Sequence, residues 1–147
     1  MADRLPVLVS VLATDAETGE EPMRVRMPGT LEDQSDCVVL RYTESLAEDG
    51  GVSAERTEVT LRAGADHAVM QRRGAFGAMM VFRPGETRES AYHTPYGDLP
   101  MAVRTRAVAF TRDADRGEIR LDYELSLKDG TFGRRLLTLT WQACRPC

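Results

Sequence analysis

The residues of this chain that are best suited to chemistry gather in the stretch SAYHTPYGDLPM, residues 90 to 101. It holds His93 together with Tyr92, Tyr96 and Asp98. A histidine near a carboxylate could transfer protons at neutral pH. Acid–base catalysis would also need a nucleophile in reach, and no serine or cysteine motif supplies one. We therefore expect no catalytic residue, and an enzyme that uses the His93 and Tyr96 region is kept as an alternative.

The chain ends in a C-x-x-C motif formed by Cys144 and Cys147. Such a motif does redox chemistry when a helix follows it, and it binds zinc when two further ligands join it. We expect no helix to follow the motif, and the sequence holds no second C-x-x-C. We expect residues 143–147 to be a frayed tail, with a metal shared between two chains as the alternative, and we predict no metal site and no cofactor. Cys37, in CVVLRY, is expected to be a small buried hydrophobic residue.

Arginine supplies every basic residue except Lys128, and eight arginines stand in four close pairs that could contact phosphates. The net charge of -4 and the interleaved acidic residues argue against a nucleic-acid partner. The predicted role of these arginines is surface ion pairing, with an RNA-associated accessory protein that uses the outer arginines as an alternative. The pairs are Arg24 with Arg26, Arg72 with Arg73, Arg104 with Arg106 and Arg134 with Arg135.

Size and composition indicate one globular domain spanning residues 1–147, with 42% hydrophobic and 29% charged residues. The apolar run from Leu5 to Ala13 is too short to cross a bilayer and lacks a basic segment before it. We read it as a buried first strand rather than a signal peptide. An odd set of three cysteines fits a reducing compartment. The expectation is a cytoplasmic protein without a membrane partner.

Apolar residues alternate with polar ones along most of the chain, and no stretch keeps a helical stripe. The clearest case is IRLDYELSLK, residues 119–128, in which every second side chain is apolar or aromatic. Turn residues separate such runs at regular spacing, which is typical of an antiparallel meander. The predicted strands lie near residues 5–13, 22–28, 37–43, 56–62, 67–73, 76–83, 87–93, 99–111, 117–128 and 132–142.

The predicted fold is all-β, a single up-and-down antiparallel barrel of about eight to ten strands, because closure removes sheet edges. Its interior either holds a small apolar ligand or is filled by side chains. Tyr123 and Trp141 are the large inward candidates. Small side chains share one face of a long strand, at Met101, Val103, Thr105, Ala107 and Ala109. If a ligand is present, the side chains expected to face it are Tyr92, Thr94, Thr105 and Tyr123.

Strand alternation in the opening stretch places Tyr92 and Thr94 on one face and His93 on the other. Pro95 suits the second position of the following tight turn, and Gly97, two residues later, permits a positive φ as in a type II turn, with Asp98 in the fourth position. The polar cluster is therefore predicted to reflect a hairpin rather than a catalytic site.

A set of residues from Arg73 onward carries a resemblance to a known family: Arg73, Gly74, Phe82, Gly85, Tyr92, Thr94, Tyr96, Gly97, Leu99, Met101, Thr105, Gly117, Ile119, Leu121, Tyr123 and Leu125. With these residues the sequence resembles the YwiB-like family of small bacterial proteins of unknown function. The resemblance implies a calycin-like β-barrel, the architecture of lipocalins, and brings no activity or catalytic residue with it. The chain is accordingly expected to be a non-enzymatic small-molecule-binding or structural module.

Overall fold

A computed structural model describes residues 4–15, 23–34, 36–46, 55–74, 77–94, 96–113, 115–128, 130 and 132–143. Over these residues the structure is all-β, with the expected strands at the expected places. Their bounds are β1 Arg4–Asp15, β2 Met23–Asp33, β3 Cys37–Leu46, β4 Glu55–Gly64, β5 Ala68–Gly74, β6 Ala78–Phe82, β7 Thr87–Thr94, β8 Gly97–Arg112, β9 Arg116–Leu127 and β10 Phe132–Ala143. In the described part of the chain no helix is long and apolar enough to cross a membrane.

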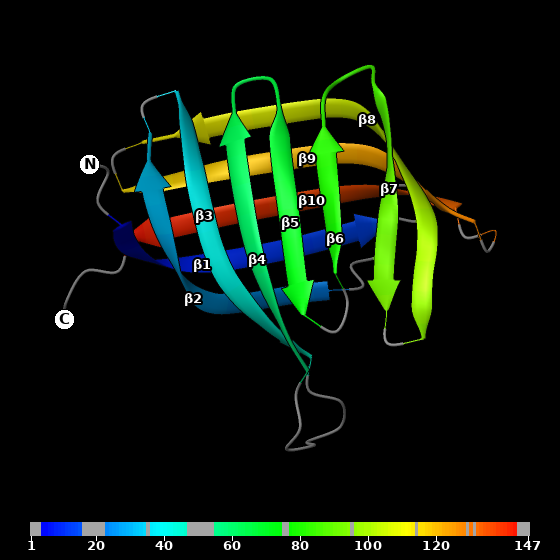
Figure 1. Cartoon of the computed structure of the whole chain (residues 1–147). Helices are drawn as coiled ribbons and strands as arrows, with labels where there is room; N and C mark the ends of the chain where they lie inside the picture. Colours follow the sequence, from blue (N-terminus) through cyan, green and yellow to red (C-terminus); the bar gives the residue numbers. More distant parts are fainter. Residues whose placement is uncertain are drawn as a thin grey trace.

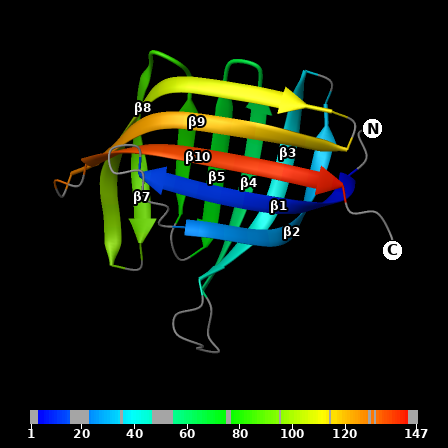
Figure 2. The same cartoon turned by 180° about the vertical axis from the view of Figure 1, so that it is seen from behind.

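The strands form one antiparallel sheet in the order β6-β5-β4-β3-β2-β1-β10-β9-β8-β7. The sheet folds over itself, so that β3 to β7 cross steeply over β8, β9, β10, β1 and β2 (Figure 1). Viewed from behind, the second set of strands forms the near layer (Figure 2). The first and last strands pair from Val7 with Ala143 to Asp15 with Arg135. This meander confirms the predicted barrel.

The barrel is nearly closed where β6 meets β7. The junction has one isolated bridge, in which Gly77 and His93 exchange both backbone hydrogen bonds at 2.9 and 2.7 Å. The connection after β6 then bonds to the middle of β8, through Gly85 and Glu86 to Thr105. β6 and β7 are thus consecutive in the sequence but are linked here by a single bridge rather than by a full ladder of hydrogen bonds.

Two strands bend so that they belong to both layers. β2 passes the predicted strand end at Pro28 and continues to Asp33, pairing with β3 only from Gly29 onward. A Cβ at Gly29 would lie 2.5 Å from the backbone oxygen of Arg41 and 2.8 Å from Val9, so only glycine fits at this corner. The strand continues past Pro28 because, as far as the described pairing shows, the missing N–H falls where β2 is still an edge strand.

The second bend is a β-bulge in β8. Thr105 pairs with Tyr123 and Ala107 with Asp122, which leaves Arg106 as the extra residue. The bulge reverses the alternation, so that Thr105 is buried while Ala107 and Ala109 are exposed. The expectation that both alanines share the inner face with Met101, Val103 and Thr105 is therefore wrong.

Side chains from both layers fill the middle of the barrel. The rings of Phe82 and Tyr123 meet edge to face across the interior with centroids 5.0 Å apart. Trp141 is 2% exposed, which confirms that it points inward, and its ring lies on Gly117, where a Cβ would come within 2.0 Å. The remaining fully buried side chains include Leu40, Leu61, Met70, Ile119, Leu121 and Leu139. The core around these residues is apolar.

Candidate ligand site inside the barrel

Two Arg-Arg doublets, Arg72–Arg73 in β5 and Arg134–Arg135 in β10, place positively charged side chains inside the barrel. Successive side chains of a strand point to opposite faces, so one arginine of each doublet must face inward. In β5 the inward residue is Arg72, which shares its face with buried Met70, while Arg73 is exposed. In β10 it is Arg135, which shares its face with buried Leu137. Two consecutive arginines in a predicted strand were therefore a sequence signal for an inward-facing arginine. The predicted ligand-facing residues did not include either of these arginines.

Arg72 is held by a carboxylate from across β4. Its guanidinium donates two hydrogen bonds to Glu44 of β3, to Oε1 at 3.5 Å and to Oε2. The Glu44 side chain is 7% exposed and that of Arg72 is 24% exposed. An ion pair this buried loses much hydration, and removing one partner leaves the other uncompensated. The pair therefore fixes a charged group within an otherwise apolar wall.

Two phenols lie beside this pair. Burial raises the pKa of Tyr42, and the negative charge of Glu44 raises it further. Burial also raises the pKa of Tyr123, whereas the positive charges of Arg135 and Arg72 act in the opposite direction. Both hydroxyls are therefore protonated at neutral pH and can donate hydrogen bonds.

Arg135 completes the group, which we call the inner arginine site: Arg72, Arg135, Tyr42, Tyr123 and Glu44. Arg135 lies opposite Tyr123 in the strand register, and a Cβ at Gly133 would lie 3.8 Å from its guanidinium carbon. Among the described side chains, Arg135 has no carboxylate partner, and neither phenol hydroxyl has a hydrogen-bond acceptor. Asp15 lies opposite Arg135 in the strand register, and its side chain is outside the described residues. Arg135 and the two phenols thus offer donors that no described protein acceptor uses, whereas Arg72 donates to Glu44.

Three of the four residues predicted to face a ligand have described side chains, and all three lie on the inner face. Tyr123 belongs to the inner arginine site, and Thr105 is its neighbour in the strand register. The Thr105 hydroxyl is fully buried without a hydrogen-bond partner. Tyr92 is half-buried and packs against the core. The side chain of Thr94 lies outside the described residues.

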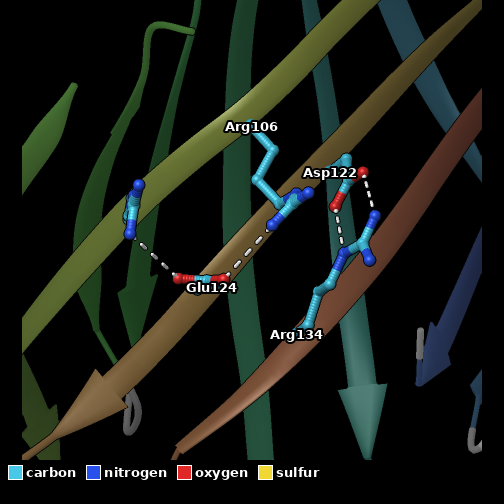
Figure 3. Close-up of polar contacts among 5 residues, drawn as sticks. Arg106, Asp122, Glu124 and Arg134 are labelled. Carbon is cyan, nitrogen blue, oxygen red and sulfur yellow. Dashed lines mark hydrogen bonds and ion pairs between the residues drawn. The ribbon is translucent and has the colours of Figure 1, made fainter. Parts of the chain in front are cut away.

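The arginines of the outer face differ from Arg135 because carboxylates hold them (Figure 3). Arg134 donates two hydrogen bonds to Asp122, at 3.0 and 2.8 Å. Arg106 lies 3.5 Å from Glu124, and Arg104 approaches the same carboxylate at 3.9 Å. The Asp122 pKa is lowered, first by its hydrogen bond with Arg134 and then by that residue's charge. These contacts agree with the predicted surface ion pairing of the outer arginines. The same prediction is wrong for Arg72 and Arg135, which lie on the inner face.

The other candidate residues do not assemble a catalytic group in the described structure. His93 is exposed and pairs with Asp98 at 2.8 Å, while the side chain of Tyr96 is 97% exposed at the tip of the hairpin. Gly97 has the predicted positive φ, at 129°, and Pro95 lies outside the described residues. Among described residues, no three histidine, cysteine or acidic side chains gather as metal ligands.

The cysteines give the structure little further chemistry. Cys37 is a free, partly buried thiol, less buried than expected, and burial raises its pKa. A raised pKa disfavours the reactive thiolate. Ala143, the first residue of the expected tail, pairs with Val7 as the last residue of β10. Cys144 and Cys147 lie outside the described residues.

Comparisons with known proteins agree with this fold. A family model described as "Domain of unknown function (DUF1934)" matches residues 9–139. The crystal structure of the ywiB protein from Bacillus subtilis superposes with a TM-score of 0.80 at 18% identity, covering 98% of this chain and 96% of that chain. No curated protein matches the sequence.

A second solved structure is a conserved protein of unknown function with a hot dog fold from Alicyclobacillus acidocaldarius. It is 12% identical, and the alignment covers 100% of this chain and 81% of that chain with a TM-score of 0.19. That score is too low for any inference about the fold.

Proposed function

The chain belongs to the DUF1934 family of domains of unknown function, and from the geometry of the inner arginine site we propose that it is a non-enzymatic module that binds a small molecule inside the barrel. The observation that carries this proposal is Arg135, a half-buried cation with no ion-pair partner among the described residues. An uncompensated charge inside a protein is costly, and a bound anion removes that cost.

The charges of the site indicate which ligand it suits. Arg72 and Arg135 carry two positive charges and Glu44 carries one negative charge, so one positive charge remains among the described side chains of the site. Guanidinium groups and phenol hydroxyls are donors that match the oxygens of a carboxylate, sulfonate or phosphate. A ligand with a single anionic group therefore fits better than one with several.

The surroundings of Arg135 suit the rest of such a ligand. Leu125 lies opposite Gly133 in the register, and Ala13 lies opposite Leu137. These side chains are apolar and pack on or within the core. Small-molecule sites commonly combine an apolar lining with a few polar groups that fix orientation. The proposed ligand is thus a small, mainly apolar molecule that ends in one anionic group.

Two fluorescent probes of similar shape test this proposal. Anilinonaphthalene sulfonate is apolar with one negative charge, and N-phenylnaphthylamine is its neutral counterpart. Arg135→Gln should weaken binding of the sulfonate by about tenfold or more, equivalent to about 1.4 kcal/mol, and leave the neutral probe unaffected. Arg134→Gln, one residue away on the outer face, is the matched control and should change neither affinity.

Circular dichroism of each variant establishes that the fold is kept. Equal affinity of the sulfonate for the wild type and Arg135→Gln would contradict the proposal, as would a wild-type protein that binds neither probe saturably. Native mass spectrometry of the protein purified from its own host provides an independent readout. The expected result is an added small-molecule mass in the wild type that is lost in Arg135→Gln.

A further inference from the structure

The strand β8 has an unpaired backbone edge after its bulge. Its first part pairs with β7 as far as Arg104, and Thr105 bonds to Gly85 and Glu86. From Ala107 to Arg112 the described pairing is with β9 alone. The backbone groups on the other side of this segment have no strand partner within the described sheet. We call Ala107–Arg112 the β8 edge.

The same layer has a second free edge, and the two differ in sequence. Before Gly29, β2 pairs only with β1 in the described structure, and this edge carries exposed Arg24, Arg26 and Pro28. Charged residues and proline on an edge discourage pairing with another chain. The β8 edge reads AVAFTR and has no proline and no charge before its last residue. Only the β2 edge is protected against strand addition.

We propose that the β8 edge pairs antiparallel with the β8 edge of a second copy of this chain. A twofold axis at Ala109 places Val108 opposite Phe110 and Ala107 opposite Thr111, and each of these contacts occurs twice. Aromatic and β-branched side chains form favourable cross-strand pairs. In the dimer, the layer that contains the β8 edge in one copy then continues into the same layer of the second copy as one sheet.

The charges at the ends of the edge favour a second copy over an acidic peptide. Arg112 is held by Asp33 at 2.7 Å, and Arg106, just before the edge, is held by Glu124 at 3.5 Å. In the twofold arrangement these residues lie opposite each other, and their own carboxylates offset the repulsion. An acidic partner would have to compete with Asp33 and Glu124 for the same arginines.

The outer surface beside the edge is suited to a close approach. Ala107 and Ala109 are exposed but small, so they do not hinder the backbone of an incoming strand. They line a hollow of about 390 Å³ that extends over β9 and β10 to Leu136, which is 38% exposed. Apolar surface of this kind is typical of the core of a subunit interface.

The test uses charges placed on the proposed twofold axis. Wild-type protein at about 100 μM should be a dimer by light scattering during gel filtration, a range in which weak complexes are populated. Ala109→Lys and Ala109→Glu should each be monomeric, because like charges meet on the axis. An equal mixture of the two variants should recover a dimer that contains one copy of each.

Gln142→Lys, an exposed change on β10, is the control and should stay dimeric. Thermal unfolding of every variant establishes that a monomer is folded. A wild-type monomer at this concentration would overturn the proposal, as would a dimeric Ala109→Lys variant. A mixture that stays monomeric would overturn the pairing about Ala109.

Discussion

Arg134 and Arg135 are neighbours in the sequence and lie in opposite environments. Arg134 lies on the outer face, where Asp122 accepts two hydrogen bonds from it. Arg135 lies on the inner face opposite Tyr123, without a carboxylate partner among the described residues. The outer arginine costs little and contributes little, because water and a carboxylate both serve it. The inner arginine makes the free energy of folding less favourable, and a role in ligand binding would explain why it is there.

The largest expected effect comes from breaking the charged pair inside the barrel. Glu44→Gln leaves the guanidinium of Arg72 without its carboxylate among buried side chains, and should lower the free energy of unfolding by about 3 kcal/mol. Urea unfolding measures the change. Adding Arg72→Met should recover much of the loss, because an apolar pair needs no compensation. A loss below about 1 kcal/mol would show that water already hydrates the pair.

The next effect is a loss of stability in alkali. The pKa values of Tyr42 and Tyr123 are raised in the folded state above the ordinary value near 10, first by burial. Their contribution to stability is therefore complete below about pH 10 and declines as the pH rises above it. Phenolate absorbance during an alkaline titration should show these two rings ionising together with unfolding. Tyr42→Phe should reduce the dependence, and an unchanged profile would contradict the assignment.

A smaller effect of opposite sign is expected at Arg135. Arg135→Gln removes a half-buried cation that no described carboxylate compensates, and should raise the free energy of unfolding by about 1 kcal/mol. The comparison is with Arg134→Gln, which should be neutral or slightly destabilising. Chemical denaturation of both variants without added ligand decides the matter. Destabilisation by Arg135→Gln would mean that the guanidinium has a structural role.

The smallest effect is expected at the outer carboxylate. Asp122→Asn should cost less than about 1 kcal/mol at neutral pH, since Arg134 is 35% exposed and the pair is partly hydrated. The Asp122 pKa is lowered in the folded protein, so its contribution is present above the ordinary value near 3.9 and is lost as the pH falls through the folded value. Stability curves of wild type and variant should therefore converge in acid. A gap that persists there would argue against the ion pair.

Sequence periodicity predicted the strands well because one face of a strand is exposed to solvent and the other is buried, so polar and apolar residues alternate. Leu137, Leu139 and Trp141 are buried as their alternation indicates, and β10 lies where it was expected. The bulge at Arg106 could not be predicted from the sequence pattern. One extra residue moves the following side chains to the opposite face of the strand, and the composition of the strand does not reveal it. That single residue is why Ala107 and Ala109 were placed on the wrong face.

The candidate site was predicted only in part, for a similar reason. Tyr123 and Thr105 were assigned to the inner face by alternation, and both are there. Arg72 and Arg135 were treated as outer residues because acidic residues are interleaved with the arginines along the sequence. Glu44 became relevant only once strand order placed it across β4 from Arg72. Pairing over such sequence distances is set by topology rather than by any local pattern.

The pairing of β1 with β10 affects the order in which the chain can fold during synthesis. Val7 to Asp15, near the start, pair with Arg135 to Ala143, near the end. Contacts between such distant residues form slowly, since a long loop must close first. While the ribosome is still making the later strands, the apolar run of β1 has only β2 beside it. The nascent barrel therefore exposes an aggregation-prone strand until β10 has been made.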